Sequence, residues 1–224
     1  MEGSTLEVFA TAEATDQRPE LVANAAAAGI PWQVVTDDVI DAITETVQPQ
    51  GLVARCAAHD MTLDALLAAG PEFVVVCADI RDPGNAGAVI RCADAAGAGG
   101  VVFVGDSVDP FNPKAVRATA GSLFHLPVVV DKDVSAVLLK LKKAGLQVLA
   151  ADGGGDVDLY DAALDLSTPT AWLMGNEAWG LPADTRALAD AVVAVPIYGR
   201  AESLNLATAA ALCLYATALA RRNG

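Results

Sequence analysis

The sequence is poor in the residues from which many catalytic and metal sites are built. Its two histidines, His59 and His125, lie far apart in the chain. A histidine-based metal site or a Ser-His-Asp triad therefore has little material, and we expect no metal. None of the four cysteines belongs to a C-x-x-C pair, which predicts free thiols in a reducing cytoplasm.

Long apolar runs are also missing. The uncharged run from Leu206 to Ala220 predicts a helix, but it is short for a membrane span, which needs about 20 residues. The N-terminus has no cationic region followed by an apolar one, so we expect neither a secretory signal nor a membrane partner. Hydrophobic residues make up 54% and charged residues 19%, which favours a globular protein with a sizeable core.

Positive charge is scarce. Fourteen Lys and Arg residues face 28 Asp and Glu residues, so the formal net charge is −14. The imbalance is strongest in residues 1–70, which hold 2 basic and 11 acidic side chains. This composition argues against a nonspecific nucleic-acid binder, although it leaves room for a local basic patch.

Residues 1–70 alternate short β-like runs with helical ones. Strands are expected at residues 6–10, 32–35 and 51–56, and helices at residues 19–28 and 37–44. This rhythm predicts a small α/β domain. Because the sequence begins abruptly on a strand, we expect further residues to precede it in the native protein. Residues 57–71 are expected to form a helical connector, and Gly70-Pro71 marks the domain boundary, with residues 71–224 as the second domain.

Residues 71–224 repeat the alternation on a larger scale. We expect strands at residues 72–78, 99–105, 126–130, 146–150, 170–174 and 191–197, and helices at 85–96, 112–120, 134–144, 183–189 and 206–220. Apolar strand runs of this kind are typical of a mostly parallel sheet that is covered on both faces. The last helix is apolar nearly all round, so we expect it to be buried.

The connection after the strand at residues 72–78 has the sequence DIRDPGNAGAVIRCADAAG. It carries G-x-x-G, at Gly84 and Gly87, and not the G-x-G-x-x-G of dinucleotide sites. We expect Asn85, at the loop, and Arg91, on the helix, to point to one side. An Arg91 that merely lies along the protein surface is an equally good interpretation of the residues alone.

Three other polar features are candidates for function. Lys114 and Arg117 share one face of a short helix and suit phosphate, although such pairs are usually only solvated. Glu177 follows a strand in Gly-Asn-Glu, at the sheet edge where open α/β sheets bind ligands; an acid at a helix start is the alternative. Residues 199–205 form a polar loop between two apolar elements, and loops so placed often carry function.

These motifs together resemble the SpoU (TrmH-like) ribose methyltransferases of the SPOUT superfamily, thiostrepton-resistance type included. The resemblance covers residues 72–222 and rests on Asn85 to Arg91, Gly175-Asn176-Glu177 with Gly180, Ser203-Leu204-Asn205, and NPKAVRATAGSLFHLPV. Residues 1–70 loosely resemble the ribosomal-protein-like α/β domain with which many members bind RNA. The resemblance implies a C-terminal trefoil-knotted α/β domain with a mostly parallel sheet, which binds S-adenosylmethionine, and a homodimer with its active site near the subunit interface.

The resemblance also implies the roles of individual residues. The cofactor contacts are Gly175, Val195 and Leu204. The catalytic residues are Arg91, Asn85, Glu177, Ser203 and Asn205. The RNA phosphate contacts are Lys114 and Arg117. The reaction implied is methyl transfer from S-adenosylmethionine to a ribose 2′-hydroxyl, with rRNA favoured over tRNA. The family's usual proposal makes Arg91 the base. A guanidinium with a pKa above about 12 resists deprotonation, so we assign Arg91 to the adjacent phosphate and the developing alkoxide.

Alternative functions remain open from the sequence. One alternative is a tRNA 2′-O-methyltransferase. Another is a relative that binds S-adenosylmethionine and RNA without catalysis, although the complete catalytic set argues against it. A nucleotide-binding α/β protein with a phosphate near Gly84 leaves the Gly-Asn-Glu and Ser-Leu-Asn motifs unexplained. The acidic first segment is an unusual RNA-binding domain, so the RNA surface is expected on the second domain or on residues that precede this sequence.

Overall fold

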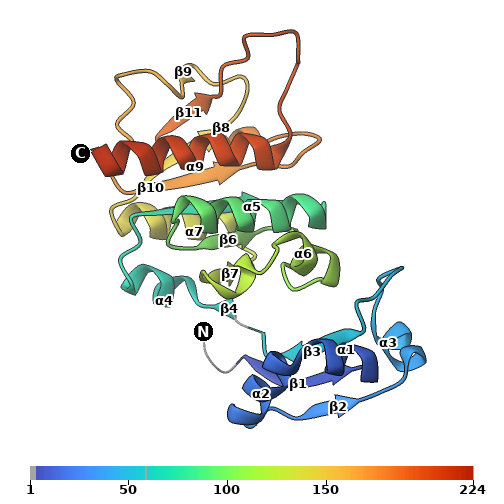
Figure 1. Cartoon of the computed structure of the whole chain (residues 1–224). Helices are drawn as coiled ribbons and strands as arrows, with labels where there is room; N and C mark the ends of the chain where they lie inside the picture. The colour runs from blue at the N-terminus through green and yellow to red at the C-terminus, as the bar shows by residue number, and fades with distance from the viewer. Residues whose placement is uncertain (1–3, 59, 224) are drawn as a thin grey trace. The chain divides into compact units, whose positions relative to one another are not determined.

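The computed structural model describes residues 4–58 and 60–223, in two compact units, Met1–His59 and Asp60–Gly224. Each unit has its own sheet (Figure 1). The division lies before the boundary expected after residue 70. Strand β4 (Asp60–Met61) pairs with β7 (Val128–Val130), and helix α4 (Leu63–Ala68) buries two leucines in the core of the second unit. Residues 60–70 therefore belong to the second unit and do not form a connector between the two units.

The first unit is the small α/β fold that the sequence predicts. Strand β1 (Thr5–Ala10) lies between β2 (Trp32–Val34), to which it is parallel, and β3 (Leu52–Cys56), to which it is antiparallel. The helices are α1 (Ala12–Gln17), α2 (Pro19–Ala27) and α3 (Asp37–Ile43). Helix α1 was not expected. It begins because the Thr11 hydroxyl accepts a hydrogen bond from the Ala14 N–H at 3.1 Å, which caps the helix.

The second unit contains a parallel sheet of eight strands, as the mostly parallel prediction requires. Its order is β4-β7-β6-β5-β10-β8-β11-β9. The strands not yet named are β5 (Phe73–Ala78), β6 (Val101–Val104), β8 (Gln147–Ala151), β9 (Val157–Asp158), β10 (Thr170–Met174) and β11 (Ala191–Ala194). The central strands β5 and β10 are buried along their whole length. This burial explains why their residues are apolar without alternation.

Helices cover both faces of this sheet. Helices α5 (Pro83–Ala96) and α9 (Leu206–Asn223) pack with one set of β5 side chains, and α4 and α7 (Val134–Lys143) pack with the alternate set. Helix α6 (Pro113–Ala118) lies against α5, and α8 (Ala183–Arg186) precedes β11. The crossing of α5 and α6 is close, because a Cβ on Gly87 would lie 2.6 Å from the Ala118 Cβ. No helix among the described residues is long and apolar enough to cross a membrane.

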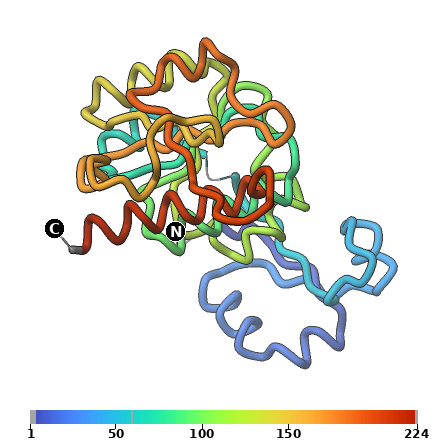
Figure 2. Tube along the Cα trace, turned by 90° about the horizontal axis from the view of Figure 1, so that it is seen from above, coloured from blue at the N-terminus to red at the C-terminus, as the bar shows by residue number. Residues whose placement is uncertain are grey.

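The last helix is not buried all round, and in this respect the expectation was wrong. Ala210, Cys213 and Leu214 are fully buried, whereas Tyr215 and Leu219 are 50% and 62% exposed. The reason is that α9 packs on α5, β8 and β10 with one side only. Figure 2 shows the segment that leaves β11, turns through a loop and continues into α9. The trefoil knot implied by the resemblance stays a prediction.

Candidate functional site

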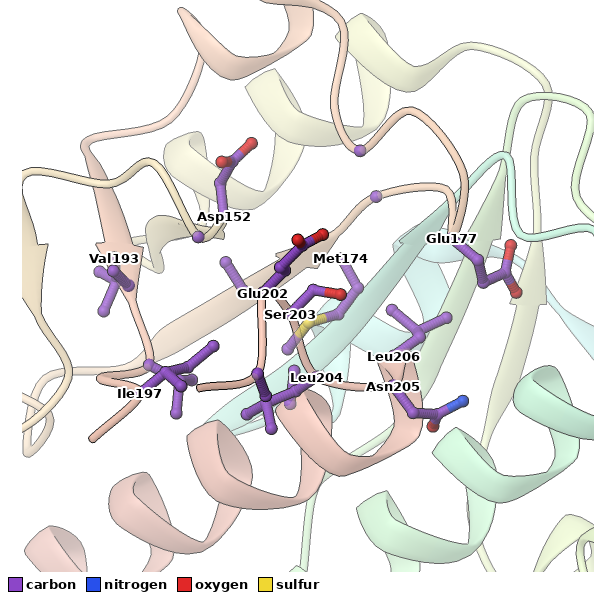
Figure 3. A pocket seen from close by; sticks show the side chains of 18 of the residues that line it. Asp152, Met174, Glu177, Val193, Ile197, Glu202, Ser203, Leu204, Asn205 and Leu206 are labelled. Atoms are coloured by element: carbon purple, nitrogen blue, oxygen red, sulfur yellow. The ribbon is translucent and has the colours of Figure 1, made fainter. Parts of the chain in front are cut away.

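A cavity of about 670 Å³ lies at the carboxyl ends of β8, β10 and β11. Its floor includes Ala151, Met174 and Val193, the residues at or near the ends of these strands. Its sides come from the loop after β10 and from residues 193–206, which connect β11 to α9 (Figure 3). Ligands of open parallel sheets bind at this edge, where the loops between strands and helices are free to form a site.

The loop after β10 is held in one conformation by Asn176, which is 5% exposed. Its backbone exchanges two hydrogen bonds with Gly180, at 3.0 and 2.9 Å. Its side chain donates to the Asp79 carbonyl at 2.6 Å and accepts from the Ala178 N–H at 2.8 Å. Gly175 is required beside it, because a Cβ there would lie 2.5 Å from the Gly180 carbonyl carbon. Asn176 belongs to the Gly-Asn-Glu motif, but no role was predicted for it from the sequence.

Three predicted site residues from distant parts of the chain form one hydrogen-bonded set. The Asn85 amide donates to Glu177 Oε1 at 3.0 Å, and the Asn205 amide donates to Asn85 Oδ1 at 3.0 Å. Asp82, the N-cap of α5, accepts from the Asn85 N–H at 2.8 Å, and Asn205 in turn accepts from the Ala207 N–H at the start of α9. The starts of two helices and one rigid loop therefore hold these polar groups in place.

The remaining cavity residues separate into a polar side and an apolar side. Gly175, Val195, Ser203 and Leu204 all line the cavity, as do Asn85, Glu177 and Asn205. In Figure 3, Glu177 and Asn205 lie on one side, and Val193 and Ile197 lie on the opposite side. An apolar side of this kind suits a flat heteroaromatic group, and the polar side suits a hydroxyl.

Three predicted residues are outside the set that lines the cavity, namely Arg91, Lys114 and Arg117, and all three are exposed. Helix α5 begins at Pro83, so Asn85 is already helical. Six helical residues advance about 9 Å and leave two side chains about 120° apart. The structure therefore does not bring Arg91 and Asn85 together at the cavity. Lys114 lies 3.7 Å from Asp82, next to the start of α5.

The charge of the cavity is negative. Asp152, Glu177 and Glu202 line it, and no Lys, Arg or His does so within the described part of the chain. Asp152 has a counter-ion, since its carboxylate lies 3.5 Å from Arg186. Neither Asp152 nor Glu202 was predicted from the sequence, although Asp152 directly follows β8 and could have been found by that position. A site with this charge favours a cationic ligand over an anionic one.

A buried thiol beneath the site is chemically quiet. Cys77 is fully buried at the end of β5. Burial raises the pKa of this thiol far above its ordinary value, and the charge of Glu177 raises it further. Since the thiolate is the reactive form, Cys77 has a packing role and is no nucleophile. Among the described residues no group of three His, Cys, Asp or Glu side chains is placed to hold a metal ion.

The fold and the site define a two-unit α/β protein with a ligand cavity at the carboxyl edge of a parallel sheet. Comparison with known families identifies the family to which the chain belongs. The model of the "SpoU rRNA Methylase family" matches residues 72–215, and that of "RNA 2'-O ribose methyltransferase substrate binding" matches residues 4–62. The chain belongs to the SpoU rRNA methylase family.

Individual relatives agree with this assignment. The chain is 36% identical to the 23S rRNA (guanosine(2553)-2'-O)-methyltransferase RlmP of Bacillus subtilis (strain 168), over 84% of this chain and 72% of the relative. It is 32% identical to the 23S rRNA (guanosine-2'-O-)-methyltransferase RlmB of Shewanella oneidensis, over 91% of this chain and 84% of the relative. The crystal structure of the AdoMet-bound rRNA methyltransferase from Sinorhizobium meliloti superposes with a TM-score of 0.82 at 35% identity, covering 99% of this chain and 81% of that one.

Proposed function

We propose that this protein transfers a methyl group from S-adenosylmethionine to a ribose 2′-hydroxyl of rRNA. The observation that carries the proposal is the hydrogen-bonded set of Glu177, Asn85 and Asn205 beside a cavity of cofactor size. The matched relatives support the substrate class, because both are named as 23S rRNA 2′-O-methyltransferases. The AdoMet-bound structural neighbour supports the cofactor.

The residues of the cavity fit S-adenosylmethionine. Gly175, Val195 and Leu204 line it with backbone groups and small or apolar side chains, which suit the adenine ring. Asp152 and Glu202 give the cavity negative charge, which would suit the sulfonium and ammonium groups of this ligand. The bound cofactor supplies a methyl group on a positively charged sulfur. Transfer of this methyl group would convert the ribose 2′-hydroxyl to a methoxy group, leave a neutral thioether and release the hydroxyl proton to solvent.

The polar side of the cavity would orient the ribose hydroxyl. Glu177 fixes the Asn85 amide, and Asn85 and Asn205 each keep one amide N–H that no described residue accepts. These N–H groups and the Ser203 hydroxyl can bind the 2′-oxygen and the adjacent oxygen of the ribose. A nucleophile held in line with the methyl group gains rate through positioning, which lowers the entropic part of the barrier.

Arg91 would act from outside the cavity. Its guanidinium is exposed and makes no ion pair with the described residues, so its five donors are available to a phosphate. We assign it to the phosphate next to the reacting ribose and no longer to the 2′-oxygen itself, because the structure leaves Arg91 outside the cavity that the Asn85 set lines. Replacement of Arg91 by Lys keeps the charge and removes the bidentate fork. Full turnover by the Arg91→Lys variant would show that the fork has no role.

The RNA surface is assigned mainly to the second unit. In the first unit, the Arg55 guanidinium is already paired with Glu7, and residues 1–70 hold only 2 basic side chains. Lys114 and Arg117 on α6 are exposed, and Lys114 stands beside the N-cap of the helix that carries Asn85. We assign both to RNA phosphates, whose contacts position a strand without reading its sequence.

A homodimer is part of the proposal. The exposed face of α9 carries Tyr215 and Leu219, one turn apart, next to half-buried apolar residues of the same helix. A helix face of this composition suits a partner, because removing apolar surface from water lowers the free energy.

The four cysteines are free in the structure, which supports the reducing cytoplasm as the compartment.

The first test is calorimetric titration with S-adenosylmethionine, S-adenosylhomocysteine and NAD. We expect binding of the first two and none of NAD. Transfer of a labelled methyl group to unmodified 23S rRNA transcript and to unmodified tRNA then identifies the substrate. We expect Asn85→Ala to lower the rate of methyl transfer on the order of 100-fold while cofactor binding persists. The reason is that the Asn85 side chain forms the hydrogen bonds to both Glu177 and Asn205. Transfer to tRNA alone would refute the rRNA assignment, and no cofactor binding would refute the whole proposal.

A further inference from the structure

An exposed tryptophan stands two residues after Glu177. Trp179 is 59% exposed, whereas Trp172 is fully buried in the core. Single exposed apolar residues are common on protein surfaces and carry no meaning by themselves. The position of Trp179 is what distinguishes it, because it lies in the short loop between Asn176 and Gly180 that also carries Glu177.

Hydrogen bonds restrain the backbone of this loop, so the position from which the Trp179 side chain projects is defined. Asn176 pairs with Gly180 through two backbone hydrogen bonds, and the buried Asn176 side chain holds the Ala178 N–H and the Asp79 carbonyl. Leu181, directly after the loop, is buried in the core. The backbone of such a loop loses little conformational freedom when a ligand binds one of its side chains, which increases the affinity that the contact can contribute.

The surroundings of the loop match a nucleic-acid strand. A continuous series of contacts leads from Glu177 to Asn85 at 3.0 Å, from the Asn85 N–H to Asp82 at 2.8 Å, and from Asp82 to the Lys114 ammonium at 3.7 Å. The ion pair of Lys114 and Asp82 is exposed on both sides, so it contributes little and can give way to a phosphate. The loop that carries Trp179 is therefore linked through Glu177 to the hydroxyl-binding set and to an ammonium group.

We propose that Trp179 stacks on an unpaired nucleobase of the RNA strand that enters the site. This inference rests on the proposed function and adds a substrate contact that positions the strand. Single-stranded RNA is recognised mainly by stacking of splayed bases on aromatic side chains, and each base offers a flat face to the indole. With the base held by Trp179 and a phosphate by Lys114, the ribose between base and backbone is brought to the Asn85 set.

The test is binding of a fluorescein-labelled single-stranded RNA of mixed sequence, measured by anisotropy, which requires no methyl transfer. We expect Trp179→Ala to weaken binding roughly 5- to 100-fold and Trp179→Phe to retain most of it. Tyr160→Ala is the matched control: Tyr160 is 57% exposed, much like Trp179, but it follows the edge strand β9, which β11, β8 and β10 separate from β5, and its removal should leave binding unchanged. Thermal unfolding checks that each variant folds.

Two further readouts separate the possible failures. Unchanged RNA affinity in Trp179→Ala would overturn the inference, and so would a change in sedimentation alone, which would mean that Trp179 contacts a second copy of the chain. Calorimetry with S-adenosylmethionine on the same proteins tests the proposed function independently. Loss of RNA binding in Trp179→Ala with intact cofactor binding supports both the stacking contact and the proposed function. Loss of RNA binding in a protein that binds no cofactor supports the stacking contact and refutes the methyltransferase function.

Discussion

Replacement of Thr217 by Val tests how α9 is held against the sheet. The Trp172 indole N–H donates to the Thr217 hydroxyl at 2.8 Å, and this hydroxyl donates to the Cys213 carbonyl at 3.1 Å. Both side chains are fully buried. Valine has nearly the same shape but no hydroxyl, so the indole N–H loses its acceptor in a place that water does not reach. An unsatisfied buried donor costs about 1–3 kcal/mol, and we expect a loss of about 2 kcal/mol.

Thr217→Ser is the matched control, because it keeps the hydroxyl and removes one methyl group, which costs about 0.8 kcal/mol. Urea unfolding followed by tryptophan fluorescence measures both variants, in a Trp32→Phe background so that both remaining tryptophans lie in the second unit. In a domain of this size about 2 kcal/mol lowers the melting temperature by roughly 4–8 °C. A Thr217→Val protein as stable as the parent, or more stable than Thr217→Ser, would refute the role of this hydrogen bond.

Three further perturbations follow from the packing and the charges of the second unit. Gly87→Ala should destabilise by about 1 kcal/mol in chemical denaturation, because overpacking against α6 costs about 1–3 kcal/mol and exceeds the gain in helix propensity, about 1 kcal/mol; equal or higher stability would contradict this. Burial alone would raise the pKa of Asp190, but hydrogen bonds from Lys142 and a backbone N–H lower it. Its stabilisation is therefore present above the unfolded pKa of about 3.9 and is lost as the pH falls through the lower folded value. Asp190→Asn should cost on the order of 1 kcal/mol at pH 7, a difference that disappears in acid; a difference that persists there would contradict the linkage. Burial raises the pKa of Cys213 to about 12, so a thiol reagent at pH 8 should modify it only after unfolding. Because Cys56 and Cys92 are only partly buried, peptide mapping identifies the labelled residue, and rapid labelling of Cys213 in the native protein would contradict its burial.

The strands of the second unit could be predicted because their residues are suited to one environment only. The runs at residues 73–78 and 170–174 are apolar on both faces, and the structure buries both completely. Strands β4 and β9 have two residues each and show no recognisable pattern, so they could not be predicted from the sequence. The exposed side of α9 could not be predicted either, because Leu and Ala residues suit a core and a contact surface equally well.

The sequence by itself determined the α/β class, the buried strands and the three polar motifs. It did not determine that these motifs meet. Asn85 and Glu177, which are 92 residues apart in the chain, come together because β5 and β10 are parallel neighbours whose carboxyl ends share one edge. Asn205 joins them because α9 packs on α5. Strand order and helix packing depend on contacts between residues distant in the chain, which is why only the tertiary structure decided the site and left Arg91 outside its cavity.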